Sequence, residues 1–260
     1  MDDEGALRKH LSRRAFLAGA GGFVAGAAVG GHLLGAVGLA APTAAEIPAW
    51  PWPYVPLDPE VVRRKAYDAY SRGGCMYGAA EAILSELREK VGHPFTAIPS
   101  EMFRYGEGGV VGWSTLCGAL NGASAVVNLV SDEKGYKAVV NELVGWYTET
   151  PLPTPQSNAF SETQVQTVAG SPLCHASVTL WCQASGFGAT SKERAERCAK
   201  LTGDTAARAV ELLNRRAAGS FVPAYGTPAG VTGCMSCHGK EGMDNTRGQM
   251  NCVQCHEPHD

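Results

Sequence analysis

The sequence predicts an all-α fold: a helical domain, an extended Pro/Trp-rich arm before it, and a mostly irregular segment rich in cysteine and histidine after it. Several segments repeat apolar residues at helical spacing and begin with residues that cap helices. No series of short alternating segments predicts a sheet. The 260 residues are 45% hydrophobic and 18% charged, which is enough apolar material for one moderate core.

Residues 1–45 have the features of an export signal. A twin-arginine box, from Ser12 to Leu17, precedes an uncharged run rich in alanine and glycine. The run is long enough to be a membrane anchor, but its glycines make it weakly hydrophobic, which favours a cleaved signal. We therefore expect a periplasmic protein with no stable membrane span after cleavage. Because the twin-arginine route exports folded proteins, a cofactor inserted in the cytoplasm is also expected.

The segment 46–57 is the extended arm. Its four prolines prevent helix formation, and Trp50, Trp52 and Tyr54 alternate with them. Two exposed tryptophans would be unfavourable in a loose linker. We therefore expect the arm to lie on the helical domain or on a second subunit.

Residues 58–218 form the predicted helical domain. Asp58 and Pro59 begin its first helix, which ends at Gly73 and Gly74. Further helices are expected over 75–91, 117–130 and 132–148, from Ser171 and Pro172 onward, and from a cap at Thr190 or Ser191 to about residue 218. A linker rich in glycine and proline, 219–233, leads to the tail, 234–260.

The tail contains two C-x-x-C-H motifs, each the attachment signature of a c-type haem. The two thiols of a motif reach the vinyl groups on one edge of a porphyrin, and the next histidine becomes the proximal iron ligand. The predicted thioether residues are Cys234, Cys237, Cys252 and Cys255, and the proximal ligands are His238 and His256. A zinc site made by the four cysteines is the alternative, but it leaves the histidine after each pair unexplained. The sequence therefore predicts two haems c.

Five further cysteines lie in the helical domain, namely Cys75, Cys117, Cys174, Cys182 and Cys198. Their odd number argues against a purely disulfide framework. Spacing alone leaves three interpretations open: buried apolar residues, disulfides, or ligands of an iron–sulfur cluster. Haem attachment follows export, so a cluster would explain why the chain folds in the cytoplasm.

The order of these cysteines resembles the family of redox-active proteins named for its C_GCAxxG_C_C pattern. The run from Cys117 to Gly122 would match G-C-A-x-x-G with its first two residues exchanged. With the arm and the haem tail added, residues 48–260 are similar to the split-Soret cytochromes c. This resemblance implies a homodimer, bis-histidine haems and an additional iron–sulfur centre. The cluster ligands that it implies are Cys75, Cys117, Cys174 and Cys198, with Cys182 as the alternate.

Two haem irons need two more ligands to become six-coordinate, and a second histidine keeps the potential lower than a methionine does. Outside the motifs, His93, His175 and His259 are the histidines of the mature chain. We favour His175 and His259 as candidate distal ligands. His259 is three residues from His256, and three residues span at most ~11 Å, so His259 can serve only a different haem.

The leading prediction is a periplasmic electron-transfer protein with redox protein partners. The sequence has no catalytic triad spacing, phosphate loop or nucleotide fingerprint. A net charge of −3 gives no electrostatic reason to bind nucleic acid. Two alternatives remain open: a haem-containing reductase with one open iron site, and a thiol-based redox sensor that uses Cys174 and Cys182.

Overall fold

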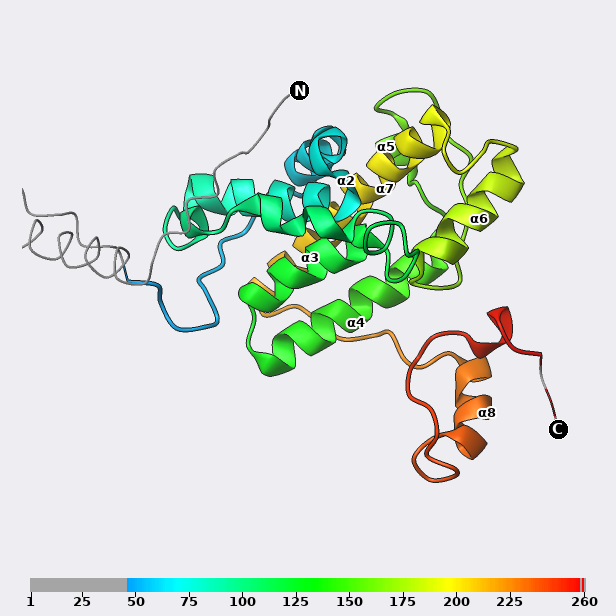
Figure 1. Ribbon diagram of the computed structural model, residues 1–260. Coiled ribbons are helices and arrows are strands. Elements are labelled where there is room, and N and C mark those ends of the chain that lie inside the picture. Colours follow the sequence, from blue (N-terminus) through cyan, green and yellow to red (C-terminus); the bar gives the residue numbers. More distant parts are fainter. Residues whose placement is uncertain (1–45, 258, 260) are drawn as a thin grey trace, which may run out of the picture. The chain divides into compact units, whose positions relative to one another are not determined.

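The structure is a computed structural model that describes residues 46–257 and 259 (Figure 1). The predicted export signal, 1–45, lies outside the described residues. The described part is helical and has two isolated β-bridges but no strand, so the predicted all-α fold is confirmed. Its elements are α2 (Pro59–Lys90), η1 (Phe95–Ala97), η2 (Ser100–Gly106), α3 (Gly118–Leu129), α4 (Glu133–Glu149), α5 (Pro155–Asn158), α6 (Cys174–Ser185), α7 (Lys192–Ala217), α8 (Ala229–His238) and η3 (Cys252–Gln254).

The helix α2 consists of two helices joined by a kink, as predicted. Asp58 caps its start by accepting a backbone N–H bond of the first turn at 2.8 Å, and Pro59 occupies the first position. Gly73 and Gly74 have non-helical backbone angles, and φ is +77° at Gly74. That conformation suits glycine because it has no Cβ. The kink turns the chain just before Cys75.

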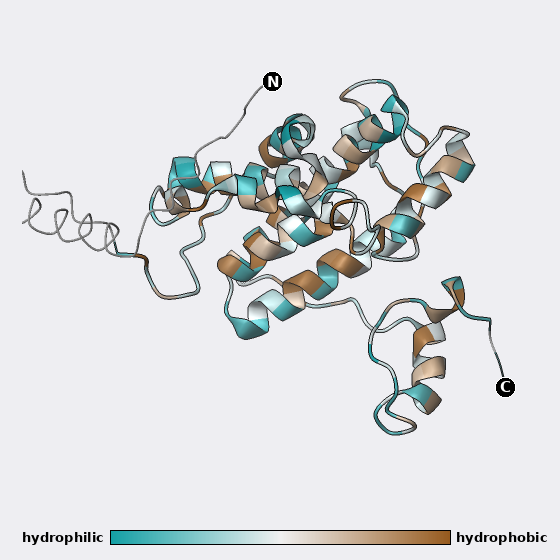
Figure 2. Cartoon of the chain, viewed as in Figure 1, coloured by the Kyte–Doolittle hydropathy of each residue, from teal (hydrophilic) through white to brown (hydrophobic). Residues whose placement is uncertain are grey.

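The core lies where α2 packs along α7 and where α3 and α4 lie side by side against them (Figure 1). Figure 2 shows hydrophobic residues on both α3 and α4. Fully buried residues of the core include Ile83, Leu84, Leu120, Leu143 and Val210. Each completely buried aliphatic side chain stabilises the fold by about 1.5–3 kcal/mol relative to its exposure. The packing of these four helices fixes the frame on which the cysteines are held.

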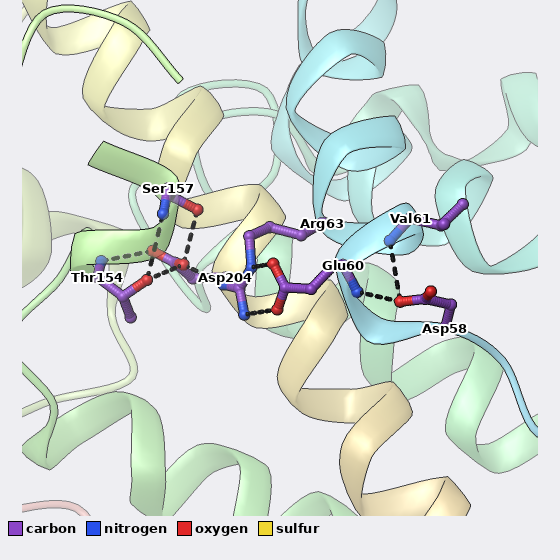
Figure 3. Close-up of polar contacts among 7 residues, drawn as sticks. All are labelled: Asp58, Glu60, Val61, Arg63, Thr154, Ser157 and Asp204. Atoms are coloured by element: carbon purple, nitrogen blue, oxygen red, sulfur yellow. Dashed lines mark hydrogen bonds and ion pairs between the residues drawn. The ribbon is translucent and has the colours of Figure 1, made fainter. Parts of the chain in front are cut away.

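A buried ion pair ties α2 to α7 (Figure 3). Arg63 donates to Asp204, whose side chain is completely buried. Asp204 also accepts the backbone N–H of Thr154 at 2.7 Å and the hydroxyl of Ser157 at 2.7 Å, while Glu60 pairs with Arg63 at 2.9 Å. The carboxylate therefore fixes the short helix α5 against α7.

The arm lies on the helical domain, which was one of the two predicted arrangements. The indole Nε1 of Trp50 donates to a carbonyl in the last turn of α3 at 2.6 Å. The ring of Trp52 packs edge-on against Phe95, with centroids 5.4 Å apart. Tyr54 donates its hydroxyl proton to Asn214 Oδ1 at 2.8 Å. The arm thus contacts α7, the last helix of the domain, just before the chain enters α2, the first one.

The structure differs from the predicted boundaries in three places. The helix α6 begins at Cys174 rather than at Pro172, because the preceding residues pair with the chain before α3. A short helix, α5, lies between the helices expected over 132–148 and from Ser171 onward, where no helix was predicted. The helix α8 begins at Ala229, inside the expected linker. Among the described residues, none of the helices combines the length and apolar character needed to cross a membrane.

Candidate functional site

Four cysteines from four separate segments line one cavity of about 460 Å³. Cys75 follows the kink of α2, Cys117 precedes α3, Cys174 opens α6 and Cys198 lies on α7. The structure therefore brings together the four residues that the resemblance implied as ligands, all as free thiols. The alternate, Cys182, is not among the lining residues. It lies two turns farther along α6, roughly 12 Å from the helix start.

Backbone pairing brings Cys117 and Cys174 together. The N–H of Cys117 donates to the carbonyl of Pro172 at 2.9 Å, and the N–H of Cys174 donates to the carbonyl of Thr115 at 2.7 Å. These two bonds flank one of the isolated antiparallel bridges. Two cysteines that are far apart in sequence thus share one wall of the cavity because their main chains are joined.

Two glycines after Cys117 explain how α3 fits against α2. A Cβ at Gly118 would lie 2.5 Å from the sulfur of Cys75, and one at Gly122 would lie 2.2 Å from the carbonyl oxygen of Met76. Neither contact is possible for a larger residue without a shift of the backbone. The C-G-A-x-x-G order therefore places the start of α3 directly on the segment that carries Cys75.

Burial dominates the electrostatics of the thiols. Loss of solvent, followed by the proximity of Cys117, raises the pKa of Cys75. Loss of solvent also raises the pKa of Cys117, although backbone N–H groups of α3 bond to its sulfur. It raises the pKa of Cys174 to about 12. These thiols are protonated at neutral pH in the metal-free chain, so a metal that binds them displaces protons.

The cavity lined by the four cysteines, at about 460 Å³, has room for a centre with several metal ions. Among residues 46–257 and 259, no group of three His, Cys, Asp or Glu side chains converges closely enough to hold one metal ion. The four cysteines instead line the walls of a shared space. Cysteine thiolates are the usual ligands of iron–sulfur clusters. The residues present therefore fit a cluster held by Cys75, Cys117, Cys174 and Cys198.

The two haem motifs lie close together in the tail. The first is on α8 and the second begins in η3. The helix α8 packs against η3, and Cys237 and Cys255 are exposed. The chain thus gathers both attachment sites in one small region.

Two histidines of the tail, His238 and His259, make defined contacts. His238 Nδ1 lies 3.1 Å from Asn245 Oδ1. With the Nδ1 proton donated to that oxygen, Nε2 is left to bind a metal, which is the common arrangement for a ligating histidine. The ring of His259 lies beside that of His238, with centroids 5.6 Å apart and planes at 84°. His175, the other candidate distal ligand, is exposed in the first turn of α6.

The chain before the tail is held by contacts to α4, which were not predicted from the sequence. The carboxylate of Glu142 accepts the backbone N–H of Ala224 at 2.6 Å and that of Tyr225, and Asn141 donates to the carbonyl of Tyr225 at 3.0 Å. A Cβ at Gly145 would lie 2.2 Å from the ring of Tyr225. Two aromatic residues, Phe221 and Tyr225, in a linker otherwise rich in glycine and proline were the available signal of such packing.

A second cavity, of about 970 Å³, lies between α4 and the tail. Its apolar lining comes from both sides, with Val140 and Val144 on α4, Val231 in the first turn of α8, and Met250 and Val253 in the tail. Ligand sites of this volume are commonly apolar with a few polar groups. A porphyrin attached to the tail could therefore pack against α4.

Comparison with known proteins gives three similarities. Residues 77–212 match the family model described as "Putative redox-active protein (C_GCAxxG_C_C)". The split-Soret cytochrome c of Desulfovibrio desulfuricans is 35% identical over 95% of both chains. A solved structure of that cytochrome, described as having a novel iron centre, matches with a TM-score of 0.73 over 80% of this chain and 91% of its own.

Proposed function

We propose that this chain, which belongs to the split-Soret cytochrome c family, is a periplasmic protein that carries electrons through two haems c and an additional iron–sulfur centre. Membership of the family supports a cytochrome c with a role in electron transfer. The observation that carries the larger proposal is the convergence of Cys75, Cys117, Cys174 and Cys198 on one cavity, outside the haem tail.

The tail supports the attachment of two haems. Each motif supplies two thiols and a histidine, with Cys234, Cys237 and His238 in the first motif and Cys252, Cys255 and His256 in the second. The bond between His238 and Asn245 would orient the first imidazole for iron. A haem bound at each motif would supply one-electron chemistry, and the chain would hold it through the two cysteines and the adjacent histidine.

We propose His259 as the distal ligand of the haem attached next to His238, because their rings lie beside each other. The second iron would take His175, from this chain or from the second subunit of a homodimer. Two histidine ligands on each iron would keep both haem potentials low. Because Cys237 and Cys255 are exposed, haems attached there would lie near the surface, where a redox partner protein could dock.

The proposed organisation follows the sequence prediction. It comprises the twin-arginine signal 1–45, the arm 46–57, the helical redox domain 58–218, the linker 219–233 and the dihaem tail 234–260. The contacts of Tyr225 with Asn141 and Glu142 would hold the tail at a fixed place on α4. Electrons could then pass between the haems and the centre in the helical domain.

The ratio of iron to haem in the purified protein, measured with its electron paramagnetic resonance spectrum, tests the proposal. Two haem irons with additional iron and a non-haem signal in the reduced protein would support it. A ratio of one iron per haem would rule out the iron–sulfur centre.

The ligand assignment is tested by Cys117→Ser, which should remove the non-haem signal and leave the haem content unchanged. The matched control is Cys182→Ser, because Cys182 lies outside the cavity. If Cys182→Ser lost the non-haem signal and Cys117→Ser kept it, Cys182 rather than Cys117 would be the ligand.

A further inference from the structure

Two arginines of α7 face the cavity of the four cysteines. Arg194, Arg197 and Cys198 follow one another at spacings that place them on one face of the helix, and all three line the cavity. Arg197 is only 1% exposed. Its Nη2 donates to Ser177 Oγ at 2.9 Å and its Nη1 lies 3.9 Å from Cys198 Sγ. The position of this positive charge is therefore fixed beside a sulfur.

Within the described residues, neither arginine forms an ion pair with a carboxylate. Arg194 donates to the carbonyl of Ala189 at 2.7 Å and to the hydroxyl of Tyr70 at 3.2 Å, both uncharged. The Nε of Arg197 is buried and has no hydrogen-bond partner. Glu107 is the one carboxylate among the described residues that line the cavity, and it forms no ion pair with either arginine.

The other buried cations among the described residues are paired. Arg63 bonds with Asp204, and Lys200 lies 3.6 Å from Glu196. A buried charge without a partner is strongly unfavourable in a folded protein. Arg197 is buried beside the cysteines and forms no ion pair among the described residues, so its charge has no paired carboxylate in the metal-free chain. Conversion of the thiols to iron-bound thiolates would provide a negative counterpart.

We propose that Arg197, assisted by Arg194, is a positioning residue that supplies the counter-charge of the iron–sulfur centre and raises its reduction potential. The inference rests on the proposed function, because it requires the centre to exist. Four thiolates with ferric irons and sulfides carry a net negative charge, and reduction by one electron makes that charge larger. A nearby fixed positive charge stabilises the reduced form more than the oxidised form.

The identity of the side chain fits this role. A guanidinium is always charged and presents five N–H donors in a rigid plane. Two of its nitrogens are occupied by Ser177 and Cys198, and Ser177 is itself held by the hydroxyl of Tyr147 at 3.0 Å. The third nitrogen, Nε, remains to donate to sulfur. The chain of contacts from α4 through α6 to α7 keeps the charge in place when the electron arrives.

The test is the midpoint potential of the non-haem signal, followed by electron paramagnetic resonance during redox titration of the complete protein. Arg197→Gln should shift this midpoint to a lower value, whereas Arg197→Lys, which keeps the charge, should leave the midpoint close to that of the wild type. The haem midpoints, measured by absorbance, should stay unchanged. The matched control is Arg208→Gln, since Arg208 is on the same helix but pairs with Glu211 and does not line the cavity.

An Arg197→Gln protein with the wild-type midpoint would overturn the inference. If that variant loses the centre, retention of the centre by Arg197→Lys supports the role of charge, and loss in both variants overturns it. Arg194→Gln gives a second measure, because this less buried residue should produce a smaller shift in the same direction. Absence of a non-haem signal from the wild-type protein would instead reject the proposed function.

Discussion

The ring of Tyr225 lies so close to Gly145 that a Cβ at position 145 would come within 2.2 Å of it. Gly145 is in the interior of α4, where alanine normally stabilises a helix by about 1 kcal/mol relative to glycine. Here the same change would displace the tyrosine that holds the chain before the tail. The two effects act on different parts of the molecule, so they can be measured separately.

Gly145→Ala should leave the thermal stability of the helical domain equal or slightly higher and make the linker 219–233 more sensitive to proteases. Limited proteolysis, with the haem-containing fragment followed by its absorbance, measures the second effect. Tyr225→Ala should give the same cleavage pattern. If Gly145→Ala leaves the cleavage rate unchanged, the contact does not hold the tail.

Gly118→Ala should remove most of the non-haem iron and leave the haem content unchanged. The added methyl group would lie 2.5 Å from the sulfur of Cys75 and 2.5 Å from the carbonyl oxygen of Gly106, so it would displace one wall of the cavity. Iron and haem analysis of the purified variant checks this result. Gly188→Ala is the control, because no heavy atom lies within 4 Å of its Cβ position.

His259→Ala should open one haem iron to carbon monoxide. If His259 is the ligand opposite His238, its removal leaves one of two irons five-coordinate, and about half of the reduced haem should bind the gas. His175→Ala tests the second iron in the same assay. A His259→Ala protein that binds no more carbon monoxide than the wild type would rule out this ligand.

Asp204→Ala should lower the free energy of unfolding by about 3–5 kcal/mol, because it leaves the buried guanidinium of Arg63 without its partner. Thermal or urea denaturation measures the loss. Glu60→Gln removes the other partner of Arg63, whose side chain is 62% exposed, and should cost less than about 1 kcal/mol. Equal effects of the two changes would show that the buried ion pair adds little.

Tyr54→Phe should reduce the loss of stability at alkaline pH. Burial raises the pKa of Tyr54 above its ordinary value of 10.0, so the unfolded chain loses this proton first as the pH rises. The stabilisation is complete below pH 10 and is lost as the pH approaches the higher pKa of the folded state. Urea midpoints between pH 8 and pH 11 should therefore fall less steeply for the variant. If the urea midpoints of the two proteins fell equally with pH, Tyr54 would not contribute to the alkaline loss of stability.

Local signals in the sequence predicted the helices well where the cap is a side chain. Asp58 and Ser191 both accept backbone bonds in the first turn of their helices. The predicted start of α6 was wrong because Leu173 pairs with a distant segment. No local sequence pattern indicates such pairing. The cysteine set followed from resemblance rather than from spacing, since only the folded chain shows that Cys182 is outside the cavity. The contacts of Tyr225 likewise depend on tertiary packing.

The four cysteines of the cavity come from segments separated by long stretches of chain, so a centre bonded to them would change the rates of folding and unfolding. A centre bonded to all four would close several large loops at once and remove many conformations from the unfolded ensemble, as a set of cross-links does. Complete separation of α2, α3, α6 and α7 would then require rupture of metal–sulfur bonds. The helical domain with its centre should therefore unfold far more slowly than the metal-free domain, and it would have to be nearly folded before the centre could form.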